Sequence, residues 1–388
     1  MTGTASAIRT GIAGAIAMAA AMGFGRFFFT PVLPAMMADL GLDAADAGFI
    51  ASANFFGYLA GAVLASYGWA AGHERRIAIG ALIANAVLLF LTAMASGLPA
   101  LAALRFLAGL ASAFAMIFTS GIVLSHGLAL KDGRVQMLHF GGVGAGIALS
   151  ALVVYLVGGH GLAGLADWRI DWLAAFVLTA VSVLVVHWLL PAGAGGMSGG
   201  AEPRLRWTPA LAGLTVSYGI FGAGYVVTAT FIVAIVRDGA GGALLECLAW
   251  LVTGVAAAVS LRLWRPFEQR FGLLGAYRVA LVLECLGVLA TVFLGLPVAA
   301  LAGGLALGGT FMVVTAFGLQ LGRRLQPEAP RRVLATMTAA FGVGQIVGPL
   351  MAGALATGTG GYGAASLAAA VLLALAAIAT FPAGRASH

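Results

Sequence analysis

Charge is the property that this chain has least of. Only 9% of its 388 residues are charged, whereas 62% are hydrophobic and the mean hydropathy is +1.05. A soluble domain carries about 25% charged residues, which keep it solvated. The shortage of charge therefore excludes a soluble globular protein, and the high hydrophobicity excludes a disordered chain.

Residues that carry metal or catalytic chemistry are also scarce. The two cysteines, Cys247 and Cys285, both fall in apolar runs and have no metal-ligand spacing. The apolar runs hold no His-x-x-x-His pattern and no Gly-x-Ser-x-Gly turn, and the chain has no Walker-type glycine-rich loop. We therefore predict that the protein is not an enzyme, binds no metal or cofactor, and does not use ATP.

Long apolar runs are what the chain has instead. They lie at roughly 10–37, 46–67, 77–96, 99–127, 135–157, 168–190, 209–236, 243–262, 272–295, 297–321, 332–357 and 361–381. Each is near the length of about 20 residues that a helix needs to cross a membrane core about 30 Å thick. Continuous runs of this kind exclude the alternating strands of a membrane barrel. We predict an all-α membrane protein with twelve transmembrane helices, embedded in a lipid bilayer.

The basic residues at or near the ends of these runs gather on one side of the predicted membrane. That side holds Arg9, Arg75, Arg76, Lys131, Arg134, Arg204, Arg206, Arg262, Arg265, Arg270, Arg323, Arg324, Arg331, Arg332 and Arg385, and the other side holds Arg169 and Arg237. The positive-inside rule makes the first side cytoplasmic, so both termini are predicted to be cytoplasmic. Because topology accounts for the net charge of +7, we expect no nucleic-acid partner.

A glycine-rich segment at the middle of the chain separates six predicted helices from six others. This segment reads PAGAGGMSGGAEPRLRW and is typical of a flexible linker. We predict an N-terminal six-helix bundle at 1–190, a cytoplasmic linker at 191–208 and a C-terminal six-helix bundle at 209–388.

Short patterns recur in the two halves. Residues 142–144 return as 342–344, and Arg105 with Gly109 aligns with Leu305 and Gly309, both at a spacing of 200; Arg26 aligns with Tyr225 at a spacing of 199. Parallel structural repeats of this kind are typical of transporters whose site lies between the repeats. The two bundles are therefore predicted to be pseudo-symmetric.

These features resemble the major facilitator superfamily over the whole chain. The segment LRFLAGLASAF at 104–114 is similar to the superfamily's fourth-helix Arg-x-x-x-Gly signature, carried here by Arg105 and Gly109. The pair GFGRFFFTPVLPAM at 23–36 and SANFFGYLAGA at 52–62 resembles the bacterial YbfB/YjiJ-type, cyanate-transporter-like facilitators. The resemblance implies a monomeric secondary transporter of the bacterial inner membrane that works by alternating access.

Two arginines of the N-terminal half lie well inside predicted spans, where a charge is costly and usually functional. These are Arg26 in the first helix and Arg105 in the fourth, and we expect no acid at mid-membrane depth in the same half. The resemblance implies that both helices line a central cavity. Because a guanidinium pairs well with a carboxylate, we predict a small organic anion as substrate, bound by Arg26 and Arg105. Both arginines can instead be structural, and efflux of hydrophobic compounds is the alternative function.

Polar residues in other spans complete the predicted site. Asn54 and Tyr58 share one face of the second helix because they are four residues apart. Tyr225 aligns with Arg26 in the repeat, and Gln345 is central in the eleventh helix, so both are candidate substrate contacts.

Proton coupling requires a titratable group inside the spans, and exchange is the alternative to it. His139 in the fifth helix and Glu284 in the ninth helix are the candidates for proton coupling, and packing is the alternative role for Glu284. Several tryptophans, including Trp168 and Trp172, fall near predicted span ends and are expected to form an interfacial belt.

Overall fold

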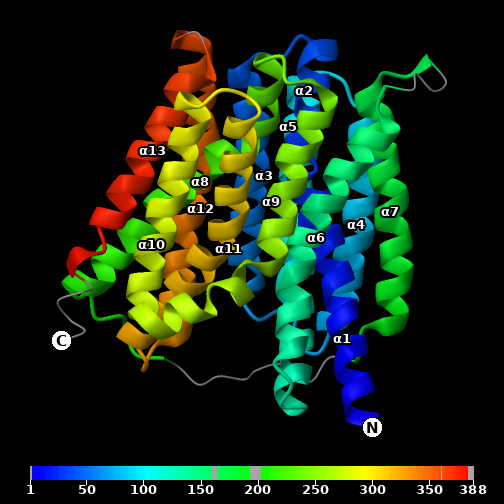
Figure 1. The fold of residues 1–388 in the computed structure, drawn as a ribbon. Coiled ribbons are helices and arrows are strands. Elements are labelled where there is room, and N and C mark those ends of the chain that lie inside the picture. The colour runs from blue at the N-terminus through cyan, green and yellow to red at the C-terminus, as the bar shows by residue number, and fades with distance from the viewer. Residues whose placement is uncertain (1, 160–163, 193–201, 360, 383–388) are drawn as a thin grey trace.

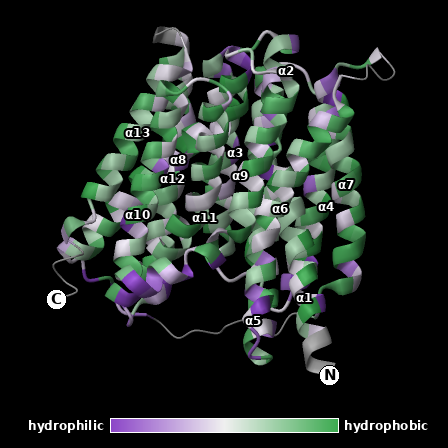
Figure 2. Ribbon diagram, in the orientation of Figure 1, coloured by the Kyte–Doolittle hydropathy of each residue, from purple (hydrophilic) through white to green (hydrophobic). Residues whose placement is uncertain are grey.

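The protein is described from a computed structural model, which covers residues 2–159, 164–192, 202–359 and 361–382. Every regular element among these residues is a helix. The helices run side by side in a single bundle (Figure 1). Hydrophobic residues cover most of the length of the helices, and hydrophilic ones are more frequent near the helix ends (Figure 2). The expected all-α membrane fold is confirmed.

The first half of the chain begins with one long, segmented span. It consists of α1 (Thr2–Met18), the π-helical turn η1 (Ala19–Phe27) and α2 (Phe29–Leu40). The helices that follow are α3 (Ala44–Ala65), α4 (Glu74–Met94), α5 (Leu98–Ala129), α6 (Arg134–Val157) and α7 (Asp167–Leu189).

The second half of the chain begins at Pro209. Its helices are α8 (Pro209–Asp238), α9 (Gly242–Leu263), α10 (Arg265–Phe293), α11 (Val298–Leu325), α12 (Pro330–Thr359) and α13 (Tyr362–Ile378). Counting residues 6–40 as one span, eleven helices of the described chain are long and apolar enough to cross a membrane, and α13 is a shorter apolar helix. The twelve predicted runs correspond to these twelve units.

Local sequence signals explain where several helices begin and end. Asp43 and Asp46 form a reciprocal capping box at the start of α3, in which each carboxylate accepts the other residue's backbone N–H. The Thr208 hydroxyl accepts from the N–H of Leu211 at the start of α8. Gly41 ends α2 in the left-handed conformation, which glycine adopts without strain.

The two ends of the bundle differ in how tightly the halves meet. We call the end where α1 begins and α13 ends the linker end, and the opposite one the loop end (Figure 1). In the loop-end half, the Thr30 hydroxyl on α2 donates to the carbonyl of Ala229 on α8 at 2.6 Å. A Cβ added to Gly48 of α3 would lie 2.2 Å from the Pro349 oxygen of α12, so these two backbones touch. The halves are therefore packed together at the loop end.

Glycine packing shows how the two halves correspond. A Cβ on Gly109 of α5 would meet the Asn54 carbonyl oxygen on α3 at 1.9 Å. A Cβ on Gly308 of α11 would meet the Thr253 carbonyl oxygen on α9 at 2.1 Å. The two contacts are the same helix crossing, repeated 199 residues later in the chain.

The alignment of Arg105 and Gly109 at a spacing of 200 is therefore wrong by one residue. A Cβ on Gly309 would meet nothing within 4 Å, unlike one on Gly109. Leu305 is 58% exposed on the outside of the bundle, whereas Arg105 is 2% exposed. The structural counterpart of Arg105 is Gly304, whose position packs against α9. The C-terminal half thus has no cation at this position.

Candidate functional site

The centre of the N-terminal half is built around a π-helical turn. Arg26 lies in the last turn of η1 and is 5% exposed. Its guanidinium carbon lies over the ring of Tyr58 at 4.2 Å from the centroid and over that of Phe55 at 4.6 Å. Cation–π contacts of this kind stabilise a cation without neutralising it. π-Helical segments inside α-helices are frequently found at functional sites.

The Arg26 guanidinium has unused hydrogen-bonding capacity. Its Nε and Nη2 atoms have no hydrogen-bond partner. The ion pairs in the described part of the chain join other residues: Arg134 with Asp132, Arg237 with Glu246, and Arg331 with Glu202. A buried cation with no anion beside it and two unpartnered nitrogens is costly. Arg26 is therefore ready to bind an anionic group.

Arg105 is used differently from Arg26. Its Nη1 donates to the Gly25 carbonyl at 3.0 Å and its Nη2 to the Arg26 carbonyl at 2.7 Å, and only its Nε lacks a partner. Its guanidinium carbon lies 5.6 Å from the ring centroid of Trp172. Arg105 thus holds the backbone of the π-helical turn from which the Arg26 side chain extends.

Asn54 and Tyr58 on α3 extend this group. The Asn54 amide nitrogen donates to the Arg105 carbonyl at 2.8 Å, and its Oδ1 has no partner. The Tyr58 hydroxyl lies 2.9 Å from the Met116 sulfur, and its ring covers Arg26. The structure therefore brings all four predicted residues of the N-terminal half into one cluster.

The facing wall of the C-terminal half is aromatic. Tyr225 on α8 is stacked with Phe311 at 5.9 Å and with Phe341 at 5.6 Å, in nearly parallel planes. The Gln345 amide nitrogen on α12 donates to the Tyr225 hydroxyl, and the Gln345 Oε1 has no partner. The two predicted residues of this half thus form one hydrogen-bonded pair.

The two walls meet through Phe27, the residue after Arg26. Its ring lies 6.2 Å from that of Phe311 and 6.4 Å from that of Trp250, both in the C-terminal half. The site is therefore an interface between a cationic wall and an aromatic wall.

Little free space remains between these walls. A cavity bordered by Arg26, Asn54, Arg105 and Thr230 has a volume of about 10 Å³. Such a volume holds about one water molecule. A ligand larger than a water molecule fits here only if the two walls separate.

The two candidates for proton coupling lie on helices that carry none of the six predicted site residues. His139 is buried on α6, where its Nε2 is 2.8 Å from the Ser120 hydroxyl and its Nδ1 has no partner. Glu284 is buried on α10, where one carboxylate oxygen accepts from the Thr310 hydroxyl at 2.9 Å and the other has no partner. Each therefore has an unused polar atom inside the bundle.

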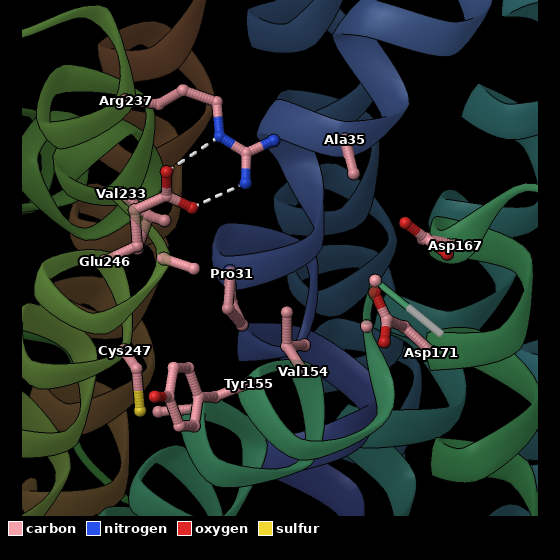
Figure 3. A pocket seen from close by; sticks show the side chains of 14 residues that line it. Pro31, Ala35, Val154, Tyr155, Asp167, Asp171, Val233, Arg237, Glu246 and Cys247 are labelled. Atoms are coloured by element: carbon pink, nitrogen blue, oxygen red, sulfur yellow. Dashed lines mark hydrogen bonds and ion pairs between the residues drawn. The ribbon is translucent and has the colours of Figure 1, made fainter. Parts of the chain in front are cut away.

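Larger cavities lie toward the two ends of the bundle. A cavity of about 560 Å³ at the linker end lies between α5, α6 and α11 and is lined by Lys131, Gln136, Gln320 and Arg323. Asp132 also lines it, and hydrogen bonds from Arg134 hold the pKa of this carboxyl below its usual range. At the loop end, a cavity of about 230 Å³ lies between the halves (Figure 3). The halves are thus separated by a wide cavity at the linker end.

Two tryptophans differ from their expected place. Trp168 and Trp172, expected in an interfacial belt, are fully buried. The Trp168 indole donates to Asp39 at 2.7 Å, and the ring of Trp172 packs edge-on against Phe28 at 5.1 Å. The expectation was wrong because α7 packs these side chains against the first span instead of turning them to lipid.

Two further residues of the site have weak sequence signals. Trp250, which contacts Phe27, lies in the middle of an apolar run. Asp171 lies inside α7, one turn after Asp167, and is 1% exposed. An acid four residues after another at the start of a span was the available signal for Asp171.

Comparison with known proteins agrees with this architecture. A family model described as "Uncharacterised MFS-type transporter YbfB" matches residues 18–381. The structure of a mutant of the nucleoside transporter NupG matches with a TM-score of 0.76 at 14% identity, over 97% of this chain and 99% of that one. A bacterial homolog of the human lysosomal transporter Spinster, inward-facing and unoccupied, matches with a TM-score of 0.75 at 13% identity, over 97% of each chain.

One curated relative is similar in sequence along nearly the whole length. A chloramphenicol resistance protein from Streptomyces lividans is 28% identical over 380 residues, which cover 93% of each chain.

Proposed function

This chain belongs to the major facilitator superfamily, in the family of the MFS-type transporter YbfB, and from that premise we propose that it carries a small organic anion across the membrane by alternating access. The observation that carries the proposal is the buried Arg26 guanidinium, with two nitrogens unpartnered and no ion pair among the described residues. A carboxylate accepts two parallel N–H bonds from such a group.

The remaining contacts define what else the substrate needs. Arg105 positions the turn that carries Arg26, and Asn54 offers a free acceptor oxygen. Tyr225 and Gln345 supply a hydroxyl and a free amide oxygen from the other half. Tyr58 and the stacked rings around Tyr225 supply apolar contact area. We infer a carboxylate-like anion with an apolar body.

The orientation of the chain decides to which side of the membrane the linker-end cavity opens. We propose this orientation, with both termini in the cytoplasm and the chain in the bacterial inner membrane as a monomer, from the positive-inside distribution of arginines. The boundaries 1–190, 191–208 and 209–388 belong to the same proposal, and residues 193–201 lie outside the described part of the chain. With this orientation, the 560 Å³ cavity at the linker end opens inward.

Coupling to protons is proposed at His139 or Glu284, with exchange as the other option. Each is buried and has an unused polar atom, so each can take part in proton transfer inside the bundle. Proton movement accompanying transport in liposomes tests this role, and loss of that movement in His139→Asn or Glu284→Gln would identify the residue.

Efflux of hydrophobic compounds is the second candidate function. The aromatic wall around Tyr225 favours it, and the relative from Streptomyces lividans is a chloramphenicol resistance protein. The central guanidinium favours the anion, because a neutral lipophilic ligand leaves that charge unpaired.

Counterflow into liposomes distinguishes the two functions. Liposomes that contain the purified protein are loaded in turn with aromatic carboxylates, aliphatic carboxylates or chloramphenicol. The exchange of the internal compound for the same radiolabelled compound outside is then measured. Exchange of carboxylates that is lost in Arg26→Ala supports anion transport. Exchange of chloramphenicol alone, unchanged in Arg26→Ala, would replace it with the efflux function.

A further inference from the structure

The loop-end cavity has walls from both halves and an unusual charge balance. One wall comes from α6 and α7 and includes Asp167 and Asp171, and the facing wall comes from α8 and α9 and includes Arg237 and Glu246 (Figure 3). Its volume is about 230 Å³, enough for a small ion with water or for a small organic ion.

The positive charge in this cavity is already neutralised. Arg237 donates from Nε to one Glu246 oxygen at 2.8 Å and from Nη2 to the other at 2.5 Å. This fork-to-fork pair lies within the C-terminal half (Figure 3). The two aspartates on the opposite wall therefore have no cation of their own in the cavity.

Asp171 is the buried member of the two. It is 1% exposed, and its Oδ1 has no hydrogen-bond partner. That oxygen lies 3.9 Å from the Cβ position of Gly158, where α6 ends. The C-terminus of a helix carries partial negative charge, so it adds to the negative potential around Asp171. Burial of an unpaired carboxylate is costly, and either a proton or a bound cation relieves that cost.

We propose that this cavity is a binding site for a small monovalent cation, with Asp171 as its charged ligand. Asp167 contributes a second carboxylate one turn away on the same face of α7, and the last carbonyl groups of α6 contribute neutral oxygens. Hard cations such as Na⁺ and K⁺ prefer oxygen ligands of these kinds, and a primary ammonium group uses the same acceptors. The chemistry shared by these ligands is a single positive charge of small radius.

A cation here would hold the two halves together at the loop end. Asp171 belongs to the N-terminal half, whereas Val233 of α8 and Ala243 of α9 line the same cavity from the C-terminal half, so the cation is enclosed only while the halves are packed together here. Bound cation would therefore stabilise the conformation in which the loop end is packed shut. Binding of the cation does not depend on the identity of the transported substrate, so it can be measured without knowing that substrate.

Thermal unfolding of the purified protein tests the site. Na⁺, K⁺ and methylammonium chlorides are compared with N-methylglucamine chloride at equal ionic strength. At a cation concentration of about 100 Kd, mass action raises the unfolding temperature by roughly a few degrees. Asp171→Asn is expected to abolish the rise. Asp238→Asn removes the same charge from an exposed position at the loop end and is expected to retain it.

A native thiol gives a second readout that needs no change at Asp171. Cys247 lines the cavity, whereas Cys285 does not, so Cys285→Ser leaves one reporter. At about ten times Kd, bound cation occupies roughly nine tenths of the sites. Alkylation of Cys247 by N-ethylmaleimide is then expected to slow about tenfold if occupied sites do not react.

The three cations distinguish the source of the ligand. Stabilisation and Cys247 protection by Na⁺ or K⁺ assign an alkali-ion site, and the same effects by methylammonium alone assign an organic ammonium site. If none of the three stabilises the protein or protects Cys247, the proposal is wrong, and this outcome leaves anion transport through Arg26 untouched. The proposal is also wrong if these cations raise the unfolding temperature of the Asp171→Asn protein as much as that of the unaltered protein.

Discussion

The two halves of the protein share helix crossings but place different chemistry at the centre. The N-terminal half brings two buried guanidiniums, those of Arg26 and Arg105. The C-terminal half brings the hydrogen-bonded pair Tyr225 and Gln345 within a stack of aromatic rings. This difference favours a ligand with a charged end that faces one half and an apolar body that faces the other.

The shared crossings explain how such a difference is tolerated. Gly109 and Gly308 make the same backbone contact, 199 residues apart, so the frame of the repeat is set by close helix packing. The position of Arg105 in that frame is occupied by Gly304 in the other half. The two halves thus repeat the helix packing but carry different side chains at the centre. Each of the following variants tests either the shared packing or the different central residues.

The largest effect is expected from Arg26→Ala. Hydrogen bonds to a charged group contribute about 1.5–3 kcal/mol, which corresponds to roughly 10- to 150-fold weaker binding of an anion. Transport is expected to fall to background while insertion into the membrane is retained. The measurement is uptake into liposomes at matched protein density. Arg278→Ala, which removes a C-terminal-half cation that bonds to Thr380, serves as the matched control; equal activity of the two variants would contradict the role of Arg26.

The shared frame is tested by adding one methyl group to each half. Gly109→Ala and Gly308→Ala each place a Cβ about 2 Å from a facing carbonyl oxygen, and overpacking of this kind typically costs about 1–3 kcal/mol of stability. Gly309→Ala places the same group in open space and is expected to leave the unfolding temperature unchanged. Similar unfolding temperatures for all three variants would show that the repeat is not held by these crossings.

Arg105→Lys tests whether Arg105 acts by charge or by shape. Lysine keeps the positive charge but loses the planar fork that donates to the Gly25 and Arg26 carbonyls. We expect substrate affinity to fall by at least about tenfold, because lysine can replace only one of two charged hydrogen bonds that contribute about 1.5–3 kcal/mol each. Affinity equal to that of the unaltered protein would show that only the charge of Arg105 matters.

The smallest effect is expected from Tyr225→Phe. The ring keeps its stacking with Phe311 and Phe341, and only the hydroxyl that accepts from Gln345 is lost. A neutral hydrogen bond contributes about 0.5–1.5 kcal/mol, so affinity is expected to fall by roughly two- to tenfold. Equilibrium binding of labelled substrate measures this. A larger loss than in Arg26→Ala would reverse the assignment of the charged and apolar walls.

The helical fold could be predicted because the membrane constrains it. Each span must satisfy its own backbone and stay apolar, so apolar run length and charge placement locate the helices. The spacing of the repeat was harder to predict, because glycine is abundant enough to align Gly109 with the wrong neighbour, Gly309. Only the contact of each glycine with a facing carbonyl distinguishes the two.

The candidate site was predictable as a set of residues but not as an arrangement. Arg26 and Arg105 stand out because charge is rare inside spans. That Arg105 bonds to backbone carbonyls follows from the π-helical turn, which no residue pattern in the sequence indicated. Asp171 was missed because it lies near a span end, where an acid usually faces water.

The central claim is that the site between the halves recognises negative charge, and isothermal titration calorimetry on the purified protein tests it most directly. A carboxylate that stabilises the protein is compared with its own primary amide, which keeps the shape and removes the charge. The expected result is binding of the acid at least about tenfold tighter than the amide, with this preference lost in Arg26→Ala. Equal affinity for the acid and the amide would contradict anion recognition and favour efflux of hydrophobic compounds.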